Sequence, residues 1–188
     1  MKPVLVLVLG MAGTGKTTLA GKLSEELKLP LVVKDDLKII ISKNLDLKKR
    51  AWSKKIGEAC YEILFHLTEK SLKVGQSIII ESTFTPKFAN PQFKKLRDSY
   101  NFTVVQVFCY ADAKIARQRF DERASSDKHH PSFGEGDEGK ENFDYRLRNK
   151  LDQPLELEGL VIRSDRTDFS KVDDNDIVDR IQSYLDRQ

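Results

Sequence analysis

The sequence predicts an α/β domain in which a parallel β-sheet is covered by helices on both faces. Apolar runs of strand length alternate along the chain with segments whose apolar residues recur at helical spacing. The first run, residues 4–9, is apolar throughout, which is typical of a strand buried on both sides. At 188 residues, the whole chain is expected to form one domain.

The first elements follow in a regular order. The strand over 4–9 leads through a glycine-bearing loop into a helix whose leucines recur every four residues. A short strand over 31–33 precedes a helix over 37–42, which Asp35 or Asp36 is expected to cap. A longer helix is predicted over 47–73, ending at a glycine.

The rest of the chain repeats this alternation. Strands are predicted over 77–81, 102–109 and 160–162, and helices over 91–100, 112–124, 143–151 and 175–185. Between them, residues 125–141 are polar, contain glycine and have almost no aliphatic side chains. Because regular patterning resumes on both sides, this stretch is interpreted as a mobile lid over about 124–142 and not as a domain linker.

Composition narrows the class of protein. The 32 basic residues nearly balance the 29 acidic ones, so bulk charge does not argue for non-specific nucleic-acid binding. No apolar stretch reaches the ~18 residues of a membrane span, so no membrane partner is expected and the cytoplasm is the expected location. Cys60 and Cys109 have neither a metal-binding spacing nor enough partners for a disulfide framework, so both are expected to be buried thiols.

Residues 10–17, here called the phosphate loop, match the pattern G-x-x-x-x-G-K-[ST] of loops that wrap nucleotide phosphates. Its glycines allow the sharp turns that aim backbone N–H groups at an anion. Lys16 supplies positive charge for the β- and γ-phosphates, and Thr17 offers a hydroxyl to Mg²⁺. ATP and Mg²⁺ are therefore the expected ligands. The predicted nucleotide-binding residues are Gly10, Met11, Ala12, Gly13, Thr14, Gly15, Lys16, Thr17 and Thr18.

Charged side chains follow the second predicted strand, at the sheet edge where ligands bind in open α/β folds. Asp35 or Asp36 is expected to accept the proton of a substrate hydroxyl. Lys38, one helical turn after Asp35, is expected to bind an anionic part of the substrate. The alternative is a capped helix with solvent-exposed charges.

Glu81 ends the third predicted strand, after three isoleucines. Its carboxylate is expected to hold a water on Mg²⁺ or to bind substrate hydroxyls, with Thr83 or Ser82 assisting. The alternative is a strand end closed by polar residues.

Two arginines precede the predicted lid. Arg119 and Arg123 are four residues apart and share a helix face, from which they are expected to close on the triphosphate, stack on adenine or stabilise developing charge. A solvated face paired with acidic neighbours is the alternative. His129 and His130 lie inside the lid, and the sequence does not decide their role.

The chain resembles the small P-loop kinases typified by the 5′-kinase domain of polynucleotide kinases, a group with chloramphenicol phosphotransferases, gluconate kinases, zeta-toxin kinases and predicted kinases of the AAA_33 type. The resemblance rests on the phosphate loop and on the Asp-Asp-x-basic segment that starts at Asp35. It implies five parallel strands in the order 2-3-1-4-5, Asp35 as the general base, Glu81 as the strand-three carboxylate, and Arg119 and Arg123 as lid arginines. Lys38 departs from the arginine of polynucleotide kinases, which disfavours bidentate recognition of a nucleic-acid phosphate.

These observations predict an ATP-dependent phosphotransferase with a small-molecule hydroxyl acceptor of the sugar, nucleoside or antibiotic class. Asp35, Lys16 and Arg123 are the expected catalytic residues. One alternative is a polynucleotide 5′-hydroxyl kinase, for which the lysine-rich stretch 48–55 would supply a basic channel. Another is an ATP-binding switch without a phosphorylated acceptor. The identity of the acceptor and the oligomeric state stay open.

Overall fold

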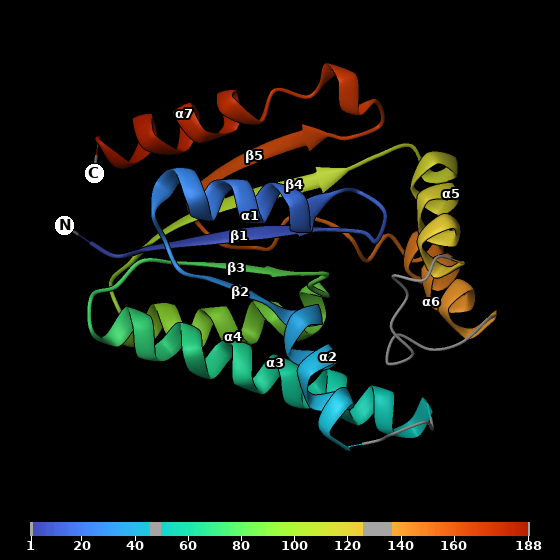
Figure 1. The fold of residues 1–188 in the computed structure, drawn as a ribbon. Helices are drawn as coiled ribbons and strands as arrows, with labels where there is room; N and C mark the ends of the chain where they lie inside the picture. The colour runs from blue at the N-terminus through green and yellow to red at the C-terminus, as the bar shows by residue number, and fades with distance from the viewer. Residues whose placement is uncertain (1, 46–49, 126–136, 188) are drawn as a thin grey trace.

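A five-stranded parallel sheet forms the centre of the protein, in the order β2-β3-β1-β4-β5 (Figure 1). The computed structural model describes residues 2–45, 50–125 and 137–187. The predicted α/β class and the strand order implied by the resemblance are both confirmed. The strands are β1 (Val4–Gly10), β2 (Leu31–Val33), β3 (Ile78–Ser82), β4 (Thr103–Tyr110) and β5 (Leu160–Asp165).

Helices cover both faces of the sheet and its carboxyl edge (Figure 1). One face carries α1 (Lys16–Leu27) and α7 (Asp174–Leu185), and the other carries α3 (Arg50–Lys73) and α4 (Pro86–Ser99). Three further helices stand near the carboxyl ends of the strands: α2 (Lys34–Leu45), α5 (Ala113–Ala124) and α6 (Asp137–Arg148). A 3-10 turn, η2 (Phe169–Lys171), precedes α7.

Two apolar cores explain why the first strand is apolar at every position. Leu5, Leu7 and Leu9 pack into the core beneath α3 and α4, whereas the valines that alternate with them pack into the core beneath α1 and α7. Successive side chains of a strand point to opposite faces, so a strand covered on both sides needs apolar residues at both parities. Packing on both faces of the sheet fixes the positions of the strand ends at its carboxyl edge.

The predicted cap of the second helix is wrong. Helix α2 starts at Lys34, directly after the last residue of β2, so Asp35 and Asp36 lie in its first turn. Val33 still pairs with Glu81 of β3, which leaves no loop residue between strand and helix. Acidic side chains in the first turn remain favourable there because they face the positive end of the helix dipole.

Two other helix boundaries differ from the prediction. The lid was expected to extend to residue 142, but residues 137–142 already belong to α6, where Gly139 approaches the Phe120 ring. Helix α4 starts at Pro86 and contains Pro91 in its interior. Ala89 and Phe93, on either side of that proline, are buried on one face of the helix, and their burial compensates for the ~3 kcal/mol that an interior proline costs.

Both cysteines are fully buried and unbridged, as predicted. Burial raises the pKa of the Cys109 thiol to about 12. Within the described ranges, none of the helices combines the length and the apolar character that a membrane crossing needs.

Candidate functional site

The phosphate loop joins β1 to α1 in a conformation that requires glycine. Gly13 has a φ of +81°, and Gly10 has a φ of +146°. A Cβ atom on Gly10 would lie 2.0 Å from the carbonyl oxygen of Cys109, and one on Gly13 would lie 2.3 Å from that of Ala116. Close packing against β4 and α5 therefore holds the loop in shape. The first turn of α1 has N–H groups without intrahelical acceptors, which makes this end of the helix suited to an anion.

Some side chains of the phosphate loop form contacts within the protein and are therefore not available to a ligand. The Thr14 hydroxyl donates to the carbonyl oxygen of Met11 at 2.8 Å, and both side chains are buried. Met11 packs with Ala116 and Phe143, and Ala12 lies against the same cluster. These residues therefore offer a ligand their backbone, whereas Thr17 and Thr18 in α1 are exposed.

Glu81 links the third strand to the phosphate loop. The register of β1 and β3 places Glu81 beside Val8, and its carboxylate reaches both polar residues that end the loop. Thr17 Oγ1 donates to Glu81 Oε2 at 2.8 Å, and Lys16 Nζ lies 3.5 Å from Glu81 Oε1. Lys16 and Glu81 are 6% and 2% exposed, so the pair is nearly removed from water. Three of the predicted site residues are thus brought together.

The Thr17–Glu81 contact has the right donor chemistry for Mg²⁺. Hydroxyl and carboxylate oxygens are hard ligands, and Mg²⁺ in phosphate-transfer sites takes few protein ligands because it keeps water and substrate phosphates around it. Over the ranges that the structure covers, no group of three or more His, Cys, Asp or Glu side chains converges as a metal cage would need. A metal held mainly by phosphate oxygens fits this donor set.

Asp35 and Asp36 have different surroundings. Asp35 lies two residues after Val33, which pairs with Glu81. The charge of Asp35 is one of the smaller causes that raise the pKa of the Tyr61 phenol, after burial. Asp36 is the more exposed of the two, and its partial burial together with the charge of Asp35 raises the pKa of its carboxyl. Asp35 is the less exposed of the two carboxylates, and its charge acts on Cys60 and Tyr61 of α3.

Tyr61 of α3 organises the region next to Asp35. Its hydroxyl donates to the carbonyl oxygen of Thr83 at 2.7 Å and accepts from Ser82 Oγ at 3.2 Å. Lys34 Nζ lies 4.6 Å from the centroid of its ring. Burial raises the pKa of the Tyr61 phenol, so it acts here as a neutral hydrogen-bonding group. Lys34, Tyr61 and the end of β3 thus form one cluster beside the phosphate loop.

Arg119 is held by the segment that follows β5. It donates from Nη1 to the carbonyl oxygen of Arg166 at 2.7 Å and from Nη2 to that of Thr167 at 2.8 Å. Its guanidinium carbon lies 3.9 Å from the ring centroid of Phe169. Arg123, one turn further along α5, is exposed. The two arginines therefore share a helix face, as predicted, but have different environments.

Arg166 is a site residue that the sequence interpretation missed. It is 3% exposed, pairs with Asp174 of α7, and stacks near Phe169. Among the residues that the structure describes, none is hydrogen-bonded to its Nε, and its Nη2 lies 3.7 Å from the position of a Cβ on Gly15. Arg166 directly follows β5, but the strand predicted from the sequence ended at residue 162, so this position at a strand end was not recognised.

Arg146 was also missed, and no sequence signal pointed to it. Its guanidinium binds Asp152 at 2.7 Å, the Thr85 hydroxyl at 2.9 Å and the Phe84 carbonyl oxygen at 3.3 Å. This arginine fastens α6 to the segment after β3.

Some predicted features lie outside the described residues. They are His129 and His130, the central part of the predicted lid (126–136), and Lys48 and Lys49 of the lysine-rich stretch. Lys54 and Lys55 of that stretch are exposed on α3, where Lys55 Nζ lies 5.4 Å from the Trp52 ring centroid.

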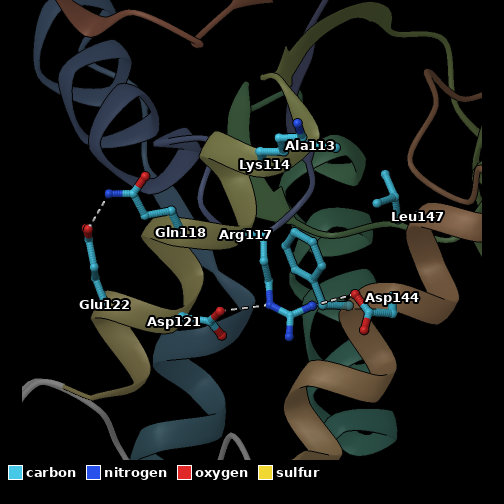
Figure 2. Close-up of a pocket in the computed structure, with 9 residues that line it drawn as sticks. Ala113, Lys114, Arg117, Gln118, Asp121, Glu122, Asp144 and Leu147 are labelled. Carbon is cyan, nitrogen blue, oxygen red and sulfur yellow. Dashed lines mark hydrogen bonds and ion pairs between the residues drawn. The ribbon is translucent and has the colours of Figure 1, made fainter.

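A hollow of about 590 Å³ lies between α5 and α6 (Figure 2). Figure 2 shows Arg117 between two carboxylates, with Asp121 at 2.9 Å and Asp144 at 2.5 Å. None of the predicted site residues lines it. Arg117 therefore joins two helices, whereas Arg119 on the neighbouring face of α5 reaches the segment after β5.

Comparison with known proteins gives a family and a set of structural neighbours. The family model described as AAA domain (AAA_33) matches residues 5–144. A crystal structure of a provisionally assigned kinase from Chloroflexus aurantiacus j-10-fl has a TM-score of 0.89 and 29% identity, covering 98% of this chain and 99% of that one. No curated protein matches the chain.

Two more distant structures share the fold. A gluconokinase from Sinorhizobium meliloti 1021 has a TM-score of 0.55 and 16% identity, over 99% of this chain and 92% of its own. Shikimate kinase from Acinetobacter baumannii, solved with shikimate, has a TM-score of 0.55 and 18% identity, over 98% of this chain and 93% of its own.

Proposed function

Because this chain belongs to the AAA_33 family of small P-loop kinases, we propose that it transfers the γ-phosphoryl group of ATP to a hydroxyl group of a small molecule. The match over residues 5–144 and the similar kinases confirm the predicted class of enzyme. The small-molecule acceptor is the further step. It is supported by gluconokinase and shikimate kinase, whose names specify small alcohols as substrates.

The proposal rests on one observation: the carboxyl edge of the sheet carries both the phosphate loop and Asp35, which adjoins the cluster of Lys34, Tyr61 and the end of β3. Glu81 contacts Lys16 and Thr17 on one side. On the other, it pairs with Val33, two residues before Asp35. A triphosphate in the loop and an alcohol beside Asp35 would therefore meet at this edge.

The residues then have separate roles in the transfer. Asp35 accepts the proton of the alcohol while the alcohol oxygen bonds to the γ-phosphorus. The bond between that phosphorus and the oxygen that bridges it to the β-phosphate breaks, and ADP is released. Lys16 and the loop N–H groups stabilise the charge on the phosphates. Thr17 and Glu81 would hold Mg²⁺, which would add further charge neutralisation. Catalysis then comes chiefly from positioning and electrostatics.

The arginines hold the nucleotide. The guanidinium of Arg119 is fixed by hydrogen bonds to two carbonyl groups and by the Phe169 ring against one of its faces. Its other face is a rigid surface on which adenine stacks. Arg123 stabilises the charge that develops between the β- and γ-phosphates.

A transfer assay with paired variants tests the base. Labelled ATP is supplied with sugars, nucleosides, antibiotics and a 5′-hydroxyl oligonucleotide, and the product is identified. Asp35→Asn is expected to lower transfer by at least about 100-fold with nearly unchanged ATP affinity, because it removes the proton acceptor only. Asp36→Asn, its exposed neighbour, is the control and is expected to retain transfer.

Other outcomes separate the alternatives. Loss of transfer in Asp36→Asn but not in Asp35→Asn would move the base to Asp36. Transfer to the oligonucleotide alone would favour the polynucleotide kinase. ATP hydrolysis that continues in Asp35→Asn, with no phosphorylated acceptor, would favour the ATP-binding switch.

A further inference from the structure

We propose that the protein accepts GTP as a phosphate donor about as well as ATP, because the surface that binds the base recognises the face of a purine and not its edge. The inference rests on the proposed function, since it names the range of donors for the same transfer. Adenine and guanine have similar faces. Their edges differ at C6, where adenine has an amino group that donates a hydrogen bond and guanine has an oxygen that accepts one.

The guanidinium of Arg119 provides the face that a base would contact. Its carbon lies 3.9 Å from the centroid of the Phe169 ring, and two carbons of that ring lie 2.9 Å from the position of a Cβ on Gly15. Arg119 and Phe169 therefore lie beside the loop that would bind the phosphates of the same nucleotide. Stacking on a planar cation or an aromatic ring tolerates every base, because each base has a π-face.

The segment after β5 contacts the edge of Arg119, so its carbonyl groups are the candidates to accept a hydrogen bond from the amino group of adenine. Four successive carbonyl groups of this segment already accept hydrogen bonds from within the protein: those of Arg166, Thr167, Asp168 and Phe169. The first two accept from Arg119, and the other two accept from backbone N–H groups three residues further along the chain. Their bonding is complete without a base.

The two carbonyl groups bound to Arg119 are also poorly placed for a stacked base. The N–H groups of a guanidinium lie in its plane, so the oxygens at 2.7 Å from Nη1 and 2.8 Å from Nη2 lie near that plane. A base stacked on the free face lies about 3.5 Å from it. A hydrogen bond from the edge of this base would have to bend out of the base plane, and bent hydrogen bonds are weak.

The acidic side chains of the segment are engaged by their neighbours as well. Asp165 Oδ1 accepts from the backbone N–H and the hydroxyl of Thr167, and Asp168 Oδ1 accepts from the same two groups of Ser170. Lys171 Nζ lies 3.3 Å from Asp168 Oδ2. Strong selection of one base needs a polar group of the site that the wrong base leaves unpaired. The polar groups of this segment are instead paired with one another, so stacking is the interaction that remains for a purine.

A binding experiment tests the inference without any acceptor. With saturating Mg²⁺, calorimetry measures the Kd of ADP, of GDP and of the 5′-diphosphate of purine riboside, whose base carries no group at C6. We expect the three values to agree within about tenfold, equivalent to about 1.4 kcal/mol. A site that hydrogen-bonds the edge of adenine would separate them by about 10⁴-fold. A difference larger than about tenfold between ADP and either of the others would overturn the inference.

Inorganic pyrophosphate, which lacks a base, tests whether the face of the base is bound. We expect it to bind at least about tenfold more weakly than ADP. Arg119→Gln is expected to weaken ADP and GDP by the same factor, about tenfold, and to leave pyrophosphate unchanged. Lys114→Gln removes an exposed charge from the same helix and is expected to leave all three ligands unchanged. Pyrophosphate that binds as tightly as ADP, or a loss in Arg119→Gln that is equal for pyrophosphate or confined to ADP, would overturn the inference.

A transfer experiment separates this inference from the proposed function. With an acceptor found in the screen with ATP, kcat/KM for GTP is expected to lie within about tenfold of that for ATP. Transfer from ATP alone would overturn the inference and support the proposed function. Equal binding of ADP and GDP, with no transfer from either triphosphate to any alcohol, would support the inference and contradict the proposed function.

Discussion

Glu81 connects the two halves of the candidate site at the scale of single residues. Its carboxylate accepts from the Thr17 hydroxyl, lies 3.5 Å from the Lys16 ammonium, and is almost completely buried. This carboxylate therefore lies at the point where the phosphate loop ends, beside the hydroxyl that is proposed to bind Mg²⁺.

Replacing this carboxylate tests its link to the metal. Glu81→Gln keeps the shape and one acceptor oxygen but removes the charge. We expect the Mg²⁺ concentration for half-maximal ATP turnover to rise by about 10- to 100-fold, the usual effect of losing a group that orients a metal site. The measurement is a Mg²⁺ titration of turnover. Glu58→Gln, exposed on α3, is the control, and equal Mg²⁺ dependence in both variants would contradict the assignment.

At the scale of elements, tight joints between segments position the site. The phosphate loop is pressed against β4 and α5, α2 starts without a loop after β2, and Arg146 fastens α6 to the segment after β3. Each joint depends on contacts between residues distant in the chain. Helical periodicity reveals the elements but not these joints, which is why the predicted cap at Asp35 or Asp36 and the predicted start of α6 were wrong.

The joint at Gly10 yields a stability prediction. Gly10→Ala is expected to destabilise the protein by roughly 2–4 kcal/mol, because its Cβ would lie 2.0 Å from a backbone oxygen and its φ of +146° disfavours any side chain. Gly57→Ala, in α3 where the added Cβ would meet no atom outside the neighbouring helix backbone within 4 Å, is expected to stabilise the protein by about 0.5–1 kcal/mol. Urea denaturation measures both changes. A similar loss of stability in the two variants would show that the loop is not tightly packed.

The joint at Arg146 yields another. Its pair with Asp152 is largely buried, with side-chain exposures of 13% and 9%. Arg146→Ala is expected to lower the free energy of unfolding by about 3 kcal/mol, because a buried carboxylate loses its partner. A double-mutant cycle with Asp152→Asn measures the coupling. Arg148→Ala, exposed on the same helix, should change stability by less than about 0.5 kcal/mol. A coupling energy near zero would contradict the role of this pair.

At the scale of the whole molecule, the parallel sheet gathers the site. Thr17 and Asp35 follow β1 and β2, Glu81 lies near the end of β3, and Arg166 follows β5. Since parallel strands end at the same edge, all four residues reach that edge without being close in sequence. The nucleotide would therefore contact segments spread over most of the chain, and its binding should stabilise the whole fold.

Ligand-dependent unfolding measures this effect. At a concentration 100 times its Kd, a non-hydrolysable ATP analogue with Mg²⁺ is expected to raise the free energy of unfolding by about 2.7 kcal/mol. Lys16→Ala is expected to remove most of this gain, because the phosphates lose their main cation. The readout is thermal unfolding with increasing analogue. No shift in the unmodified protein would contradict nucleotide binding itself.

The sequence by itself determined the alternating elements, the phosphate loop and the position of Glu81 at a strand end, because each of these follows from a local sequence pattern. Glycine spacing and uninterrupted apolar runs depend on nearby residues only. Tertiary structure alone decided which side chains meet: Thr17 with Glu81, Tyr61 with Lys34, Arg119 with the carbonyl groups after β5, and Arg146 with Asp152. Most of these contacts join residues tens of positions apart, and the packing of helices on a twisted sheet, not the spacing along the chain, sets the distances between them.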